Sequence, residues 1–427
     1  MVEPPEQDRK GASPRIINRL CRRAATRRRA GTKAMHTMKK IVLTVLVSGL
    51  FVCARAQDIE SILQQVEQNN KELQAIRRGN EVSELEIRGR NTLEDPSVEY
   101  SPFYVKGNDG MASSELVVSQ VFDFPTLYVA RHRAGKLQEE VLDLQYQASR
   151  RDILLEAKNR CLDLVYQNRL LSLLELRRKN AGELLTLFTR KLEAGDATQL
   201  EVNKIKMDRM NIRTETAQAE TARQTILQEL LALNGNVPLT GEPVEYGAEP
   251  SVADCEALYA RAVASDYDLR TARASELAAA QEVKVSRQNW IPKLAVGYRR
   301  NTELKEARNG FLVGATFPLF SSRRKVRMAR AQHAGMQLQL ENTRLQTETR
   351  VRARIHELQM LGKTVEAYDV ELMYHTLDLL RKAVESGEIS VIDYYVEADG
   401  IYRNLQTRME LERQYQGVVA ELLKNEL

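Results

Sequence analysis

The chain of 427 residues is 43% hydrophobic and 28% charged, a composition that excludes a disordered polymer. Its net charge of +5 comes from the N-terminal segment, because residues 1–40 contain 12 Lys or Arg and only 3 Asp or Glu. Once Arg55 is also discounted, the net charge from Gln57 onward is −5. The positive net charge of the whole sequence therefore gives no support to nucleic-acid binding by the residues from Gln57 onward. Only 6% aromatic residues and 11 prolines favour a mostly helical fold.

Residues 38–56 have the three parts of a secretory signal peptide. Met38-Lys39-Lys40 is positive, residues 41–53 are apolar, and Ala54-Arg55-Ala56 puts small residues before Gln57. The apolar run is too short to span a bilayer as a helix. We expect export and cleavage before Gln57. Residues 1–37 are then an N-terminal leader outside the mature protein, with translation starting at Met38 or Met35.

Other interpretations of the front of the chain stay open. The apolar run could be a buried core helix, and residues 9–33 could be a nucleic-acid arm. Cys53 could carry a lipid, although bulky Val52 precedes it where a lipoprotein signal has a small residue. After cleavage only Cys161 and Cys255 remain, which is no disulfide framework but leaves one bridge possible.

Residues 57–250 form a first predicted unit. Residues 58–92 have apolar side chains at helical spacing, and Asp95-Pro96 ends that segment. Alternating residues predict strands at about 97–104 and 114–123. A helix without proline then covers 128–194 and would be ~95–100 Å long, more than a globular core needs. After a turn at 195–196, a second helix covers 197–234.

Residues 251–427 repeat this order. Strands are predicted at about 293–300 and 310–319, helices at 323–386 and 388–427, and a turn at 387–388. Phe317-Pro318 matches Phe124-Pro125 at an offset of 193, and Gly387 matches Gly195 at 192. Such a long period indicates a duplicated half-protein and not a solenoid. Each half is predicted to contain, in this order, a helix, a β-hairpin, a long helix, a turn and a return helix.

The predicted strands are long enough to cross a bilayer when tilted. Four strands cannot close a barrel with an interior, and an open sheet edge is unstable in lipid. Several chains would have to combine their strands, and three chains would supply 12. The alternative is a small soluble sheet that caps a helical domain. Aromatic residues on or beside the strands indicate membrane interfaces: Tyr100, Tyr104, Trp290, Tyr298 and Phe311.

The mature chain, residues 57–427, resembles the TolC-like outer-membrane efflux protein family. The resemblance rests on the signal peptide, the duplication, the Phe-Pro joints, and the turns at 193–196 and 385–388. It implies a mainly α fold with four membrane strands, in which long helical hairpins form a trimeric α-barrel topped by a 12-stranded β-barrel. It also implies a homotrimer in the outer membrane and its lipid in a Gram-negative bacterium. Most of this trimer would lie in the periplasm, where it docks with an adaptor protein and an inner-membrane pump of the resistance-nodulation or ABC type. Neither an enzymatic activity nor a cofactor is implied.

The resemblance also implies site residues. Asp393 matches the first acidic residue of the family's periplasmic constriction, and Glu201 is its counterpart in the first copy. Where the best-known member has a second aspartate, this chain has Val396, followed by Glu397. The turns resemble adaptor-docking tips, which comprise Gly195, Asp196, Gly387, Glu388, Ile389 and Ser390. The alternatives are a solvated helix carboxylate at Asp393 and plain helix caps at the glycines.

Three interpretations of the function remain open. The first is a passive exit duct for small molecules or metal ions, since residues 93–96 and 122–125 faintly resemble the family's heavy-metal branch. The second is the outer-membrane duct of type I protein secretion. The third is a soluble periplasmic coiled-coil scaffold or adaptor. No metal site is predicted, because the histidines of the mature chain are scattered.

Overall fold

The structure is a computed structural model that describes residues 58–104, 111–243, 245–247, 254–303, 306–318 and 322–427. Residues 59–427 form one compact unit. The predictions for residues 1–56, including the leader, the signal peptide and lipidation at Cys53, lie outside the described residues. Cys161 and Cys255 are both free thiols, so the bridge that the sequence left open is not formed.

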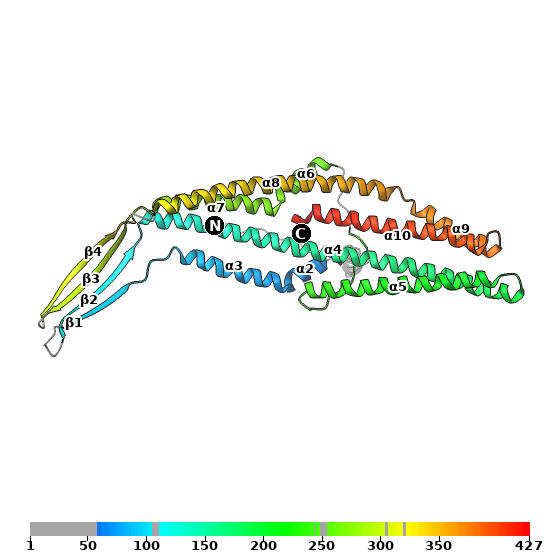
Figure 1. Cartoon of the computed structure of the whole chain (residues 1–427), viewed down its shortest axis with the longest axis horizontal. Helices are drawn as coiled ribbons and strands as arrows, with labels where there is room; N and C mark the ends of the chain where they lie inside the picture. The colour runs from blue at the N-terminus through cyan, green and yellow to red at the C-terminus, as the bar shows by residue number, and fades with distance from the viewer. Residues whose placement is uncertain (1–57, 105–110, 244, 248–253, 304–305, 319–321) are drawn as a thin grey trace, which may run out of the picture. The chain divides into compact units, whose positions relative to one another are not determined.

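Each half of the unit contains a β-hairpin that is followed by a long helical segment and a return helix (Figure 1). The first half comprises α2 (Asp58–Asn69), α3 (Lys71–Gly89), β1 (Ser97–Tyr104), β2 (Met111–Phe122), α4 (Pro125–Ala194) and α5 (Gln199–Leu233). The second comprises α6 (Cys255–Ser265), α7 (Tyr267–Gln288), β3 (Lys293–Glu303), β4 (Glu306–Thr316), α8 (Ser322–Glu366), α9 (Val370–Ser386), α10 (Val391–Leu422) and the short η1 (Lys424–Glu426).

Local sequence determines where α4 begins and ends. Pro125 opens the first turn, where its missing N–H costs nothing, and it holds Phe124 in an extended conformation. The 70 residues that follow correspond to a rod of roughly 105 Å. At the far end Gly195 adopts φ = 86°, and Asp196 N–H donates to the carbonyl oxygen of Lys191 (2.7 Å). This left-handed glycine cap is the stop that the sequence predicts.

Two helices that the sequence predicts as continuous are interrupted. The segment 58–92 breaks at Asn70, whose side chain accepts a hydrogen bond from Leu73 N–H (2.9 Å) and donates one to the Leu233 carbonyl (2.9 Å). The segment 323–386 breaks before Val370, where the Asp369 carboxylate accepts from Leu372 N–H (2.9 Å). Asn and Asp cap new helices because their side chains compete for backbone donors. The second long helix is therefore two pieces, α8 and α9.

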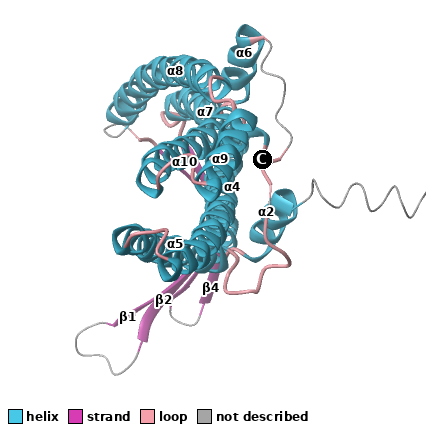
Figure 2. Cartoon of the chain, turned by 90° about the vertical axis from the view of Figure 1, so that its right-hand side faces the viewer, coloured by secondary structure: helices cyan, strands magenta, loops and turns pink. Residues whose placement is uncertain are grey.

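The long helices lie side by side in a curved layer. Near the sheet the order is α3, α4, α7, α8, and beyond the middle α4 contacts α5 and α10, with α9 packed on α10. Seen from the end where the helical turns lie, the layer is a crescent with α2 and α6 on its convex side (Figure 2). The helix α4 thus joins both halves of the chain. The two ends of the crescent, α3 and α5 on one side and α8 on the other, have no helix beyond them among the described elements.

The strands form one antiparallel sheet in the order β1-β2-β3-β4. Pairing of β2 with β3 joins the hairpins of the two halves, with Val118 opposite Tyr298. Gly297 permits this close pairing, because a Cβ there would lie 2.5 Å from the Val118 carbonyl oxygen. No described strand pairs with the outer edges of β1 and β4. The observed strands extend beyond the predicted limits at the turn ends, with β2 starting at Met111 and β3 ending at Glu303.

The sheet is apolar on one face. Directly paired residues of an antiparallel sheet point to the same side, so the register determines the members of each face. One face is mostly apolar and carries Val98, Tyr100, Leu116, Val118, Phe122, Leu294, Val296, Tyr298, Phe311, Val313 and Ala315, with Gln120, Arg300 and Asn309 among its polar members. The opposite face is mostly small or polar, with Ser97, Glu99, Ser119, Gly297, Arg299, Gly310 and Gly314, and there Arg299 forms an ion pair with Glu115.

An arginine on α4 anchors α2 near the middle of the rod. Arg150 donates to both carboxylate oxygens of Glu67 (Nε to Oε1 2.6 Å, Nη2 to Oε2 2.8 Å) and also to the C-terminal Leu427 carbonyl. The hydrogen bond from Arg150 holds the pKa of Glu67 below its usual value. A carboxylate with a lowered folded-state pKa stabilises the fold above its ordinary pKa, and this contribution is lost as the pH falls through the folded-state value.

Glu67→Gln is therefore expected to lower the thermal midpoint of the detergent-solubilised protein at pH 7. The difference from the unsubstituted protein should vanish at an acid pH below the lowered pKa of Glu67, where Glu67 is protonated in both folded and unfolded states. The exposed Glu60→Gln on the same helix is a control for general charge loss. A Glu67→Gln deficit of equal size at both pH values would contradict this assignment.

Candidate functional site

The two helical turns at the end remote from the sheet share one design. Gly195 and Gly387 both adopt the left-handed conformation, with φ of 86° and 85°. Thr198 and Ser390 then cap the return helices α5 and α10, and an acidic residue follows in the first turn of each. These three pairs all lie 192 positions apart in the sequence. A left-handed glycine, a hydroxyl cap and an acid give each hairpin a sharp, fully hydrogen-bonded tip.

The acids predicted for the constriction are these capping residues. Glu201 accepts hydrogen bonds from Thr198 N–H (2.7 Å) and Oγ1 (2.8 Å). Asp393 accepts from Ser390 Oγ (2.7 Å), whose oxygen in turn accepts from Asp393 N–H (3.1 Å). Asp393 and Glu397 lie on one exposed face of α10, a helical turn apart. Among the described residues no hydrogen bond or ion pair joins Glu201 to Asp393, so the structure does not bring the two copies' acids together.

The predicted docking residues lie at or beside these tips. The tips are held side by side by a core from four helices, and Lys191 Nζ donates to the Glu385 carbonyl (3.2 Å). The core contains Leu173, Leu184 and Phe188 of α4, Val202 and Ile205 of α5, Leu377 and Val384 of α9, and Val391, Tyr394, Tyr395, Ala398, Tyr402 and Leu405 of α10. Gly195, Asp196, Gly387 and Glu388 are exposed above it, and Ile389 packs against it.

The predicted membrane aromatics all lie at the sheet end. Tyr104 ends β1, and Trp290 lies in the connection from α7 to β3, where it is 67% exposed. Tyr298 and Phe311 pair at the midpoints of β3 and β4 on the apolar face. Tyr100 is likewise within β1 on that face. Tyr104 and Trp290 thus lie where an interface girdle would be, whereas the other three lie along the strands.

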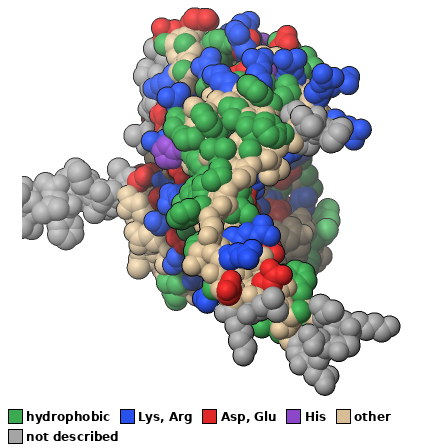
Figure 3. All heavy atoms as spheres, turned by 90° about the vertical axis from the view of Figure 1, so that its left-hand side faces the viewer, with side chains coloured by type: hydrophobic (Ala, Val, Ile, Leu, Met, Phe, Trp, Pro, Cys, Tyr) green, Lys and Arg blue, Asp and Glu red, His purple; other side chains and the backbone are tan. Residues whose placement is uncertain are grey.

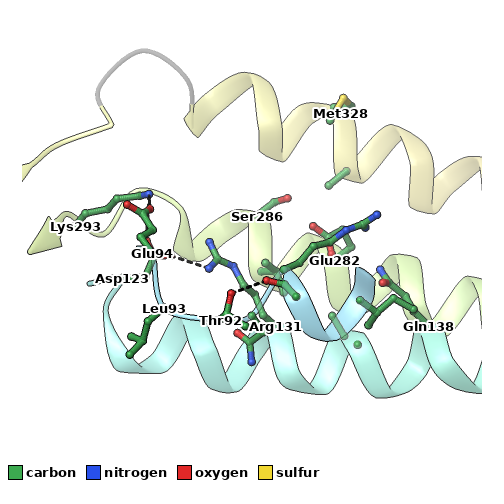
Figure 4. Close-up of a pocket in the computed structure, with 18 of the residues that line it drawn as sticks. Thr92, Leu93, Glu94, Asp123, Arg131, Gln138, Glu282, Ser286, Lys293 and Met328 are labelled. Carbon is green, nitrogen blue, oxygen red and sulfur yellow. Dashed lines mark hydrogen bonds and ion pairs between the residues drawn. The ribbon is translucent and has the colours of Figure 1, made fainter. Parts of the chain in front are cut away.

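A hollow of about 920 Å³ lies where the sheet meets the helices (Figure 4). Asp123 at the end of β2 is buried and forms an ion pair with Arg131 of α4 (2.7 Å). Glu94 forms an ion pair with Lys293, the first residue of β3, and so links the two halves of the chain. The hollow is lined by residues of α3, α4, α7 and α8, which makes it a feature of the crescent's concave side.

Residues 258–424 match the family model described as outer membrane efflux protein. This match covers most of the second half of the chain. No curated protein matches the chain. Solved structures match the fold of the chain over most of its length. Their sequence identities are low, so the matches show a similarity of fold alone. CmeC, the outer membrane channel of Campylobacter jejuni, has 13% identity and a TM-score of 0.67, over 86% of this chain and 85% of CmeC.

Two further solved channel structures match the fold of the chain to a similar extent. VceC, an outer membrane protein of Vibrio cholerae, has 15% identity and a TM-score of 0.68, over 87% of this chain and 97% of VceC. CusC, whose structures describe transmembrane channel formation, has 14% identity and a TM-score of 0.67, over 86% and 92%. The predicted resemblance to outer membrane efflux proteins and the predicted fold class, mainly helical with four strands in a TolC-like arrangement, are thus confirmed.

The chain contains a buried ionic cluster that was not predicted from the sequence. Arg177 of α4 donates to Asp208 of α5 (2.6 Å) and lies 3.6 Å from Asp399 of α10, with its guanidinium over the Tyr402 ring. Burial raises the pKa of the Asp208 carboxyl, and the nearby Arg177 offsets this only in part. A signal was present in the sequence: Arg177 lies in the apolar stripe Leu173, Leu174, Ala181, Leu184, where an unpaired charge would be costly.

Among the described residues no helix is both long and apolar enough to cross a membrane. In the same part of the chain no three His, Cys, Asp or Glu side chains are grouped as metal ligands would be.

Proposed function

We propose that the chain is the outer-membrane channel subunit of a tripartite efflux system and works as a passive, homotrimeric exit duct. The observation that carries the proposal is the four-stranded sheet. It is apolar on one face, has two unpaired edges, and lies at the end of two long helical hairpins whose remote turns are exposed. A soluble scaffold would leave this apolar face in water, which disfavours that alternative.

Three copies would resolve the unpaired edges. Backbone groups at the free edges of β1 and β4 need partners in lipid, and joining β4 of one copy to β1 of the next supplies them. Three sheets of four strands then give a closed barrel of 12, an even number in the usual range. Its apolar face would contact outer-membrane lipid and its polar face would line the pore.

The curvature of the helical layer also supports a trimer. Exposed apolar side chains lie near both ends of the curved layer, with Val82 and Leu85 on α3 and Met328 and Leu338 on α8. Closing three crescents edge to edge would cover such residues and form a periplasmic tube of 12 helices. The length of α4 would then set how far the tube reaches toward an inner-membrane pump.

The tips would close and dock the duct. Asp393 and Glu397 lie exposed beyond the α9–α10 turn, so three copies would place rings of carboxylates at the periplasmic mouth. Opening would require α9 and α10 to swing away from α4 and α5. Gly195, Asp196, Gly387, Glu388, Ile389 and Ser390 would contact the hairpins of a periplasmic adaptor, which joins the duct to its pump. The transported class would be small molecules or metal ions, and type I protein secretion is the second candidate because it uses the same duct geometry.

Asp393→Asn is expected to raise the closed-state conductance of the purified trimer in planar bilayers and to weaken its block by divalent cations. Asparagine can still accept the Ser390 hydrogen bond, so the change removes charge with little loss of the cap. Ser390→Ala is the matched control, since it removes the cap and keeps the charge. If both variants behave alike, or if Asp393→Asn conducts as the unsubstituted trimer does, Asp393 does not form the constriction. Recovery of the protein from the periplasm without detergent would contradict the duct itself.

A further inference from the structure

The start of α8 and the end of α7 carry an unusual group of unpaired cations. Arg287 of α7 and Arg323, Arg327 and Arg330 of α8 are exposed and form no ion pair with any described residue. Arginines elsewhere in the unit are commonly paired, as Arg131 is with Asp123 and Arg150 with Glu67. Seen from the sheet end, Lys and Arg side chains gather at the top of the molecule, where α8 lies (Figure 3). Four guanidinium groups near one another repel unless an anion lies among them.

These arginines surround a hollow of about 340 Å³ that we call the Trp290 hollow. Its lining consists of Ser286, Arg287, Trp290, Arg323, Val326, Arg327 and Arg330. None of the described residues that line it is acidic. Trp290, the single tryptophan of the chain, contributes an exposed aromatic ring on the sheet side. The hollow therefore contains several planar guanidinium groups beside one amphipathic aromatic ring.

The Trp290 hollow lies on the convex side of the crescent. The large hollow contacts both α3 and α8, at the two ends of the layer, and so lies on the concave side. On α8 it is lined by Met328, Ala329 and Gln332, whereas the Trp290 hollow is lined by Arg323, Val326, Arg327 and Arg330. At 100° per residue the mean directions of these two sets differ by about 160°. In the proposed trimer the convex side is the outer surface.

The depth of the hollow matches a layer of lipid headgroups. The 11 residues of β3, tilted as barrel strands are, cover roughly the 25 Å height of an outer-membrane apolar band. Trp290 lies just before Lys293, where β3 begins, and Arg330 lies eight residues, about 12 Å, along α8 from Ser322. Long arginine side chains extend toward the interface from such positions. The four guanidinium groups thus lie just beyond the periplasmic ends of the strands.

We propose that the Trp290 hollow binds the phosphodiester headgroup of an anionic phospholipid in the periplasmic leaflet. Guanidinium groups bind phosphate oxygens through paired, charge-assisted hydrogen bonds, and a basic pocket at a membrane surface selects anionic headgroups. The indole of Trp290 lies at the depth where tryptophan prefers the membrane interface. The lipid would neutralise the unpaired arginines and fix the angle between sheet and helices at the joint. This inference rests on the proposed function, because the outer surface and the bilayer depth follow from the trimer.

The single tryptophan makes the test specific. The full trimer is reconstituted in phosphatidylcholine vesicles, and quenching of Trp290 fluorescence is titrated with brominated phosphatidylglycerol or brominated phosphatidylcholine. We expect the anionic lipid to associate with an affinity on the order of tenfold higher. In Arg323→Gln/Arg327→Gln/Arg330→Gln the two lipids should quench equally. The single substitution Arg327→Gln should give an intermediate ratio and covers the case in which the triple variant assembles poorly.

A matched triple variant removes the same charge far from the sheet. Arg190, Arg209 and Arg213 are exposed near the tips and form no ion pair with a described residue, so Arg190→Gln/Arg209→Gln/Arg213→Gln should keep the full preference. Equal quenching of the unsubstituted protein by both lipids would overturn the proposal. So would a response of Trp290 to inorganic phosphate in vesicles without anionic lipid, since the site would then take a free ion. Conductance of the same vesicles separates the two failures, because a conducting trimer without lipid preference refutes the lipid site alone.

Discussion

Phe311→Arg is expected to abolish most membrane insertion of the trimer. Phe311 is at the midpoint of β4, on the apolar face of the sheet, and it is 94% exposed. In the proposed barrel its ring points into the middle of the bilayer. An arginine on the lipid face at that depth costs about 2–4 kcal/mol. Three copies would incur the cost together, so the folded, inserted fraction should fall steeply.

The neighbouring residue supplies the control. Leu312 is on the opposite face of β4, opposite Gly297, on the side that also carries the Arg299–Glu115 ion pair. Leu312→Arg would place its charge toward the water-filled interior and should leave insertion nearly unchanged. Flotation of outer membranes, with the amount of protein in the membrane fraction as readout, measures both variants. Equal insertion of the two would show that the apolar face does not meet lipid.

Local signals in the sequence predicted the architecture well because each of them had a local physical cause. The Phe124-Pro125 joint starts α4, and Gly195 and Gly387 end helices by adopting a conformation that glycine favours. Alternation predicted the strands, since only one face of the sheet is apolar. Each of these features depends on a few neighbouring residues, so a single sequence contains it.

Other features depend on partners that are distant in the sequence. Asn70 is a typical helix cap and accepts from Leu73 N–H, but the bond that its side chain donates to Leu233, more than 160 positions away, could not be predicted. The break before Val370 could have been found, since Asp369 is a typical helix cap, yet the absence of proline favoured one long helix. At the tip, Asp393 attracts interest as an acid after a turn, but its hydrogen bonds show that it also caps α10. The sequence could not separate those two roles.

The Arg177 cluster shows the same limit more strongly. Its members come from three helices, with Arg177 on α4, Asp208 on α5 and Asp399 on α10. Asn180 donates to the Tyr402 hydroxyl beside it (3.2 Å). These contacts join the outer hairpin, α4 and α5, to α10, which the proposed opening would move. The cluster thus lies across the boundary between the helices that the proposed opening would separate.

Arg177→Ala is expected to destabilise the tip by about 3–5 kcal/mol, because it leaves the buried Asp208 carboxylate without its cation. The detergent-solubilised trimer should unfold at a lower denaturant concentration, and its closed-state conductance should rise as α10 loses its hold on α4. Arg177→Met/Asp208→Leu removes both charges and keeps the volume, so it should regain most of the stability. Arg178→Ala is the control, since the neighbouring Arg178 is exposed and paired only with Glu175.

The pH dependence of Arg177→Ala provides an independent check of the mechanism. Burial already raises the pKa of Asp208, and removing the guanidinium takes away the main group that opposes this rise and leaves only the weaker effect of Lys204. In the variant the folded state therefore binds a proton at pH values where the unfolded chain has released it. Stability must then decrease as the pH rises through the interval between the ordinary and the raised pKa, and lowering the pH through that interval should reduce the deficit. A deficit that is independent of pH, or one that the double substitution does not relieve, would mean that Arg177 acts by packing against Tyr402 and not through the charge of Asp208.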